Sequence, residues 1–236
     1  MRKILLIVFL GVFCCKISAQ ERYTILVESP EDIDSKVTNH QYLFPEFTIG
    51  TIVFTDNSAT RAPLNYDMIM DQIHFTDGSG QVKKMTNDKN EIASIQIGGR
   101  EFVYSRNGFA EVLTYYNDKA LLICRRIKAE HEKATGAYGM ASDVSAVEQS
   151  AAMLSSVGSG GENVGLSNNS SVTFSIIQSI YLQSDKGLFS GGSEKNFVRI
   201  FGGNAKSIHD YVQNKGLNLK KPSDLIELFN FCANQL

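Results

Sequence analysis

The chain has 236 residues, with 23 Lys or Arg and 25 Asp or Glu, so its formal net charge is −2. This length supplies one large or two small domains with an ample core. The slight acidity argues against nucleic acid and anionic membrane surfaces as partners, because both require clustered Lys and Arg.

Residues 1–19 have the pattern of a secretory signal. Arg2 and Lys3 precede an apolar run from Ile4 to Cys15, and Ala19 offers a small-residue cleavage site before Gln20. The run is shorter than the roughly 20 residues that span a bilayer. We therefore expect cleavage between Ala19 and Gln20 and an exported protein that is periplasmic or secreted, with no transmembrane segment in the mature chain.

Two other outcomes stay open for this segment. An uncleaved signal would act as a membrane anchor, and a lipid on Cys14 or Cys15 would tether the protein. A lipid anchor is less favoured than cleavage, because Cys14 follows Phe13 and Cys15 follows Cys14, whereas a lipoprotein signal needs a small residue directly before the cysteine. Cleavage would remove three basic residues and no acid, which leaves 20 basic and 25 acidic residues and a formal net charge of −5.

Two cysteines, Cys124 and Cys232, remain after the predicted cleavage. Both lie in apolar patterns, which favours two buried thiols. A disulfide between them is the main alternative in an oxidising compartment. Two cysteines in a chain of this size form neither a disulfide framework nor a metal motif.

Residues 20–128 are expected to form an antiparallel β region. Short apolar or β-branched runs alternate with turn residues, and little helical periodicity lies between them. Asp77-Gly78 and Gly98-Gly99 are typical of tight hairpins. The pattern predicts about seven strands in a meander that curls into a roll or open barrel: Tyr23–Val27, Thr51–Thr55, Met68–Phe75, Ile92–Ile97, Arg100–Ser105, Val112–Tyr116 and Ala120–Ile127.

Residues 129–171 are about half Ala, Gly or Ser, and the composition predicts a mobile insertion. A short helix around Ala141–Leu154 is an alternative for part of it. Residues 172–236 are expected to form a β-hairpin and three short helices that pack on the same domain. Ser193 is the predicted cap of a helix over Glu194–Phe201, and Ser223 with Asp224 is the predicted cap of the last helix.

No catalytic, cofactor-binding or metal-binding residue is predicted. His131-Glu132 begins like a helical zinc motif, but Thr135 stands where the second histidine is required. Gly202–Ser207 lacks the glycine spacing of a phosphate loop and indicates a turn with a helix start. The remaining histidines, His40, His74 and His209, are scattered along the chain, and His74 is expected on the exposed face of its strand.

Three further groups are better explained by structure than by binding. The acids Glu28, Glu31, Asp32 and Asp34 lack the rest of a calcium loop. Tyr42, Phe44 and Phe47 are more typical of a core than of a sugar or peptide groove. In Leu64–Asp67 we expect a tight connection in which Asn65 or Asp67 bonds its own backbone.

Several short motifs follow one another between Phe47 and Tyr104. They are Gly50–Phe54, Ala62–Asp67, Asp71–Phe75 and Arg100–Phe102. Together with the tail Lys215–Lys220, they resemble a group of uncharacterised exported proteins of Bacteroidota-type bacteria that share the Leu-Asn-Tyr-Asn/Asp connection. The resemblance implies export and a β-rich fold, and it carries no activity or catalytic residue.

The sequence thus predicts a mainly β (α+β) protein with a small C-terminal helical cap. The favoured function is a non-catalytic envelope or periplasmic protein that binds a protein or glycan partner, without nucleic acid and without a cofactor. The alternative is a secreted hydrolase whose site is assembled from scattered residues, in which a histidine would lie within hydrogen-bond reach of a Ser or Cys nucleophile.

Overall fold

The computed structural model describes residues 22–27, 40–89, 91–105, 108–131 and 170–235. The predicted signal, with Ala19 and Gln20, lies outside these residues. So do the acidic cluster that ends at Asp34 and the helix considered around Ala141–Leu154.

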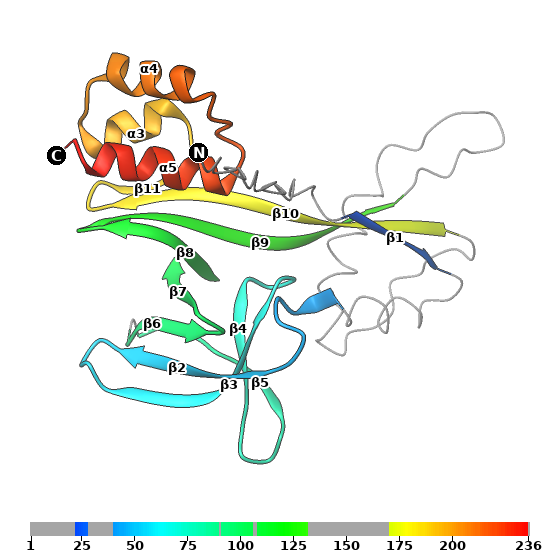
Figure 1. Cartoon of the computed structure of the whole chain (residues 1–236). Helices are drawn as coiled ribbons and strands as arrows, with labels where there is room; N and C mark the ends of the chain where they lie inside the picture. Colours follow the sequence, from blue (N-terminus) through cyan, green and yellow to red (C-terminus); the bar gives the residue numbers. More distant parts are fainter. Residues whose placement is uncertain (1–21, 28–39, 90, 106–107, 132–169, 236) are drawn as a thin grey trace, which may run out of the picture.

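The described residues form one antiparallel sheet with three helices at one end (Figure 1). In chain order the strands are β1 (Arg22–Val27), β2 (Thr48–Phe54), β3 (Ala59–Asp67), β4 (Gln72–Thr76), β5 (Val82–Lys84), β6 (Ile92–Ile97), β7 (Arg100–Ser105), β8 (Gly108–Tyr116), β9 (Lys119–His131), β10 (Ser170–Ser184) and β11 (Gly187–Ser190). The helices are α3 (Glu194–Phe201), α4 (Ala205–Lys215) and α5 (Pro222–Ala233).

The sheet consists of two meanders. Strands β2 to β5 form one and β6 to β10 the other, and the pairing of β2 with β6 joins them. The long ribbon β9–β10 pairs from His131↔Val172 to Ala120↔Gln183, while β1 and β11 pair with the two ends of β10. This arrangement confirms the predicted antiparallel, mainly β fold with a C-terminal helical cap.

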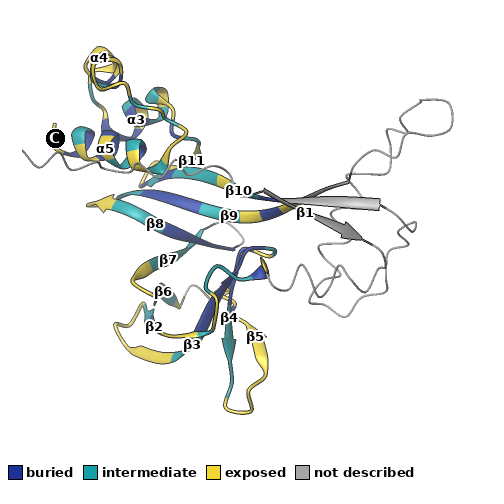
Figure 2. Cartoon of the chain, turned by 45° about the vertical axis from the view of Figure 1, so that its right-hand side comes forward, coloured by how far each residue is buried: buried dark blue, intermediate teal, exposed yellow. Residues whose placement is uncertain are grey.

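The first core cluster lies within the curled sheet and contains Tyr66, Phe102 and Phe109. The ring of Tyr66 stacks on that of Phe102 at a centroid distance of 5.3 Å. Phe44 packs against the same cluster, in agreement with the core role predicted for the aromatic group. Figure 2 shows buried stretches on β3, β8 and β9 of the sheet, and others on α3 and α5 of the helical cap.

The second core cluster joins the helices to the sheet. The stripe Leu225, Leu228, Phe229 and Cys232 of α5 is buried there together with Leu121 of β9 and Leu182 of β10. The helix α3 has the predicted bounds, because the Ser193 side chain accepts a hydrogen bond from Asn196 N and Gly202 ends the helix at φ 68°. The shared core of helices and strands confirms the prediction that the C-terminal helices pack on the β domain.

Several local predictions were wrong. Strands β3 and β5 were not predicted, and Met68–Asp71 forms a turn rather than the start of a strand. Ser223 does not cap α5, which begins at Pro222 after Lys221 without a side-chain cap. The bounds predicted for the insertion are wrong at both ends, because 129–131 belong to β9 and 170–171 to β10; residues 132–169 lie outside the described residues.

Candidate functional site

The loop between β5 and β6 is held in place by a buried asparagine. Asn87 Nδ2 donates to Ile92 O at 3.1 Å, and Ile92 N donates to Asn87 Oδ1 at 2.8 Å. Met85 N donates to Ile73 O, and Thr55 N donates to Glu91 O, both at 2.8 Å. These bonds tie the loop at Met85 and Glu91 to β4 and to the end of β2, and Asn87 joins its two ends; Asn90 lies outside the described residues.

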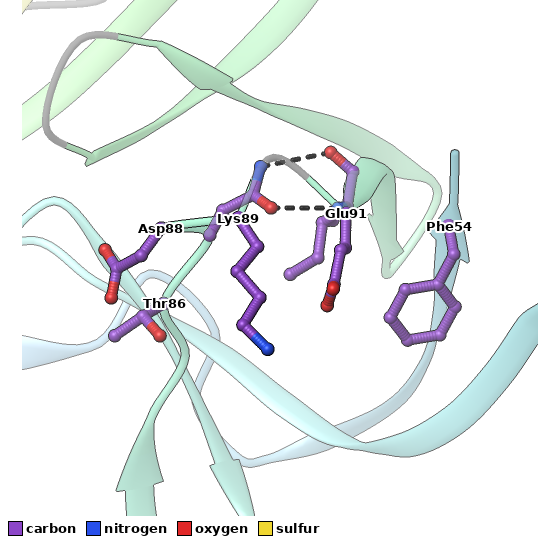
Figure 3. A pocket seen from close by; sticks show the side chains of 7 residues that line it. Phe54, Thr86, Asp88, Lys89 and Glu91 are labelled. Atoms are coloured by element: carbon purple, nitrogen blue, oxygen red, sulfur yellow. Dashed lines mark hydrogen bonds between the residues drawn. The ribbon is translucent and has the colours of Figure 1, made fainter. Parts of the chain in front are cut away.

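A cleft of about 280 Å³ opens beside this loop and is called the Phe54 cleft below. In Figure 3 the side chains of Lys89 and Glu91 extend from the loop in the same direction. The cleft therefore combines one aromatic ring with hydroxyl, carboxylate and ammonium groups. Its lining residues are Phe54, Thr86, Asn87, Asp88, Lys89, Glu91 and Ile92.

Apart from Asn87, which is bonded to Ile92, the polar side chains of the Phe54 cleft have no partner within the described chain. No hydrogen bond or ion pair is found there for the side chains of Thr86, Asp88, Lys89 and Glu91, all of which are exposed. Asp77, in the neighbouring β4–β5 turn, accepts hydrogen bonds from Ser79 and Gln81 and pairs with Lys83. The acids of the cleft are thus free to contact a ligand, whereas the acid of the adjacent turn is engaged.

A buried polar cluster lies at the junction of β3 and β4. Asp67 is fully buried and accepts hydrogen bonds from Gln41 Nε2 at 2.7 Å and from the backbone N–H groups of Ile69 and Met70. The last two bonds confirm that Asp67 binds its own backbone, although the chain turns after Asp67 and not within Leu64–Asp67. The bond from Gln41 was not predicted.

His74 is half-buried within this cluster, so its predicted place on the exposed face of the strand is wrong. Its Nδ1 lies 3.1 Å from Tyr42 Oη, and its Nε2 lies 3.4 Å from Asp67 Oδ2. Burial lowers the pKa of His74, against the attraction of Asp67. Burial, with a smaller contribution from Asp67, also raises the pKa of Tyr42 to about 12, so its hydroxyl stays protonated at neutral pH.

Two further carboxylates are buried next to arginines. Asp71 accepts a hydrogen bond from Tyr66 Oη at 3.1 Å and pairs with Arg126, and burial raises its pKa although Arg126 opposes this shift. Glu111 pairs with Arg125 and lies 3.5 Å from Arg100. These groups join β3, the turn before β4, β7, β8 and β9, and none of them lines the Phe54 cleft.

The segment Gly202–Ser207 forms a turn and a helix start, as predicted. Asn204 caps α4 by accepting a hydrogen bond from Lys206 N. The segment lines a second, smaller cleft of about 180 Å³ together with Cys232. Burial raises the pKa of the Cys232 thiol to about 12, which leaves it unreactive at neutral pH.

The remaining candidate residues are dispersed. Neither Cys124, half-buried on β9, nor Cys232, buried on α5, forms a disulfide. His209 lies 3.1 Å from Glu194, and the contacts given for His74 are with Tyr42 and Asp67. Neither set of contacts includes a Ser or Cys nucleophile.

Within the described residues no group of three or more His, Cys, Asp and Glu side chains is placed to hold a metal ion. No helix among those residues has the length and apolarity needed to cross a membrane. Comparison with protein-family models, curated proteins and solved structures found no match.

Proposed function

We propose that this chain is an exported, non-catalytic protein of the cell envelope or periplasm that binds a glycan in the Phe54 cleft. The observation that carries the proposal is the combination of one aromatic ring with unpartnered polar side chains on one loop. A pyranose presents an apolar face that packs on an aromatic ring and hydroxyl groups that both donate and accept hydrogen bonds. Phe54 offers the first contact, and Asp88, Lys89 and Glu91 offer the second.

A glycan is favoured over a protein partner because the cleft is small and polar. Protein interfaces bury about 800 Å² per partner around an apolar centre. The Phe54 cleft presents one ring among four exposed polar side chains. Such a composition suits a short run of sugar units better than it suits a protein anchor.

Binding is favoured over hydrolysis because both acids of the cleft are exposed. A general acid is kept protonated at neutral pH by an apolar, buried setting. Asp88 and Glu91 lie at the surface of the loop, where they are suited to accept hydrogen bonds from hydroxyl groups. Release of shorter sugars during the experiment below would replace the binding role with the hydrolase alternative.

The test is calorimetric titration after a screen of soluble oligosaccharides. The chain has no Trp, so intrinsic tryptophan fluorescence offers no signal. Phe54→Leu keeps an apolar side chain but removes the ring, and it is expected to weaken binding by about threefold to tenfold. Tyr115→Leu is the matched control, because Tyr115 is 69% exposed on the β8–β9 hairpin and does not line the cleft.

Two outcomes would overturn the glycan proposal. One is that no oligosaccharide of the screen binds. The other is that Tyr115→Leu weakens binding as much as Phe54→Leu does. Capture of a protein that competes for the cleft would support a protein partner instead.

Export is tested separately by the mass and N-terminal sequence of the protein recovered from a bacterial host. The proposal expects Gln20 at the N-terminus and no lipid. A chain that retains residues 1–19, or one that carries a lipid on Cys14 or Cys15, would contradict it.

A further inference from the structure

The charges of the Phe54 cleft do not cancel. Asp88 and Glu91 contribute two negative charges and Lys89 contributes one positive charge, and within the described chain no ion pair joins them. An unpaired carboxylate attracts a cation, and the attraction is stronger in a concave site than on a flat surface. The cleft therefore has a formal excess of one negative charge.

The aromatic ring adds to the same preference. The face of a phenylalanine ring attracts ammonium groups, and pockets for amines combine such rings with nearby acids. Phe54, Asp88 and Glu91 line one cleft and each favours a cation. Lys89 and Thr86 add donors that suit the hydroxyl oxygens of the same sugar.

We propose that the Phe54 cleft selects glycans that carry a protonated amino group, such as glucosamine units, over their neutral N-acetylated counterparts. The inference rests on the proposed glycan-binding function and specifies its ligand class. The amine lies between the ring of Phe54 and the carboxylate of Glu91, whereas Asp88, which extends on the other side of Lys89, adds attraction from farther away (Figure 3). The sugar hydroxyls contact Lys89 and Thr86.

The experiment compares two tetrasaccharides that differ only in acetylation, the β1,4-linked glucosamine tetramer and its N-acetylated form. Titration of the full exported protein is expected to show about threefold to thirtyfold tighter binding of the glucosamine tetramer, the range that two exposed ion pairs supply. The difference is expected to shrink as salt is raised. In the double variant Asp88→Asn, Glu91→Gln the two tetramers are expected to bind equally.

A charge-matched control separates selection by the cleft from general attraction to an acidic protein. The double variant Asp185→Asn, Asp210→Asn removes the same charge from exposed positions that do not line the cleft. It is expected to retain the preference for the glucosamine tetramer. If it loses the preference as fully as the cleft variant does, the selection by the cleft is overturned.

Failure of this inference is distinct from failure of the proposed function. Equal binding of both tetramers by the unmodified protein, with loss of both in Phe54→Leu, overturns the amine preference and leaves glycan binding in place. Absence of binding by both tetramers and by every other oligosaccharide of the screen overturns the two proposals together.

Discussion

Tyr42 Oη lies 3.1 Å from His74 Nδ1, and this contact joins the segment before β2 to strand β4. On the other side of the ring, His74 Nε2 lies 3.4 Å from Asp67 Oδ2. A neutral imidazole fits both neighbours, because Nδ1 then accepts from the tyrosine hydroxyl and Nε2 donates to the carboxylate. The arrangement therefore favours an uncharged ring in the folded protein.

The stability of the protein is expected to fall as the pH falls below about 6.5. Burial, with a smaller effect of nearby Lys84, lowers the pKa of His74 below its ordinary value of about 6.5, and Asp67 opposes the shift. The unfolded chain then takes up a proton at a higher pH than the folded protein does. The contribution of His74 is complete above pH 6.5 and is lost progressively below it.

Urea unfolding between pH 8 and pH 5 measures this loss, with His74→Gln as the reference. Glutamine retains a donor and an acceptor but does not titrate in this range. Burial raises the pKa of Asp71, so the contribution of Asp71 to stability grows as the pH falls, opposite to that of His74. This contribution is the same in both proteins and cancels when their profiles are compared. Equal pH profiles for the two proteins would show that His74 does not cause the loss.

The Asn65 side chain is expected to be worth about 3 kcal/mol of folding free energy. Its Oδ1 accepts from Phe44 N and Tyr66 N, and its Nδ2 donates to Phe44 O and Glu46 O. Asn65→Ala would leave several of these buried backbone groups unpaired, at about 1–3 kcal/mol each before relaxation.

The measurement is the free energy of unfolding in urea, with Asn218→Ala as the control. Asn218 is part of the loop before α5, and its side chain accepts one exposed hydrogen bond, from Lys220 N. Its removal is expected to cost about 1 kcal/mol or less. Similar losses in the two variants would mean that Asn65 does not fix the segment before β2.

These contacts also explain which parts of the structure follow from the sequence. Helix α3 is bounded by local signals, Ser193 and Gly202, and the β6–β7 hairpin by Gly98-Gly99, whose φ angles are 55° and 79°. Strand β3 was missed because Asn65 and Asp67 resemble turn residues. Besides bonds to neighbouring backbone groups, Asn65 is satisfied by Phe44, 21 positions away, and Asp67 by Gln41, 26 positions away. A single sequence gives no signal for such distant partners.

The Phe54 cleft was not predicted for a similar reason. Phe54 ends β2, and the other lining residues lie between Thr86 and Ile92. They meet only because β2 pairs with β6, which places Phe54 opposite Ile92. This pairing crosses three intervening strands, and no local pattern of residues indicates it.

Cys232 is expected to react with iodoacetamide far more slowly in the folded protein than in urea at pH 8. The thiol is buried in α5, and burial raises its pKa to about 12, so both access and the thiolate fraction are low. Mass spectrometry of peptides after timed labelling gives the rate at each cysteine. Rapid labelling of Cys232 in the folded protein would show that the helical cap opens readily.

Gly108 is expected to tolerate no side chain. A Cβ at this position would lie 2.5 Å from Asp71 O, and that oxygen accepts a hydrogen bond from Phe109 N at 2.8 Å. Gly108→Ala must therefore push β8 away from the turn before β4, at a cost of about 1–3 kcal/mol. Gly78→Ala is the matched control, because a Cβ there meets no atom within 4 Å, and the change is expected within about 1 kcal/mol of zero. Equal free energies of unfolding for the two variants would contradict the close approach of β8 to Asp71.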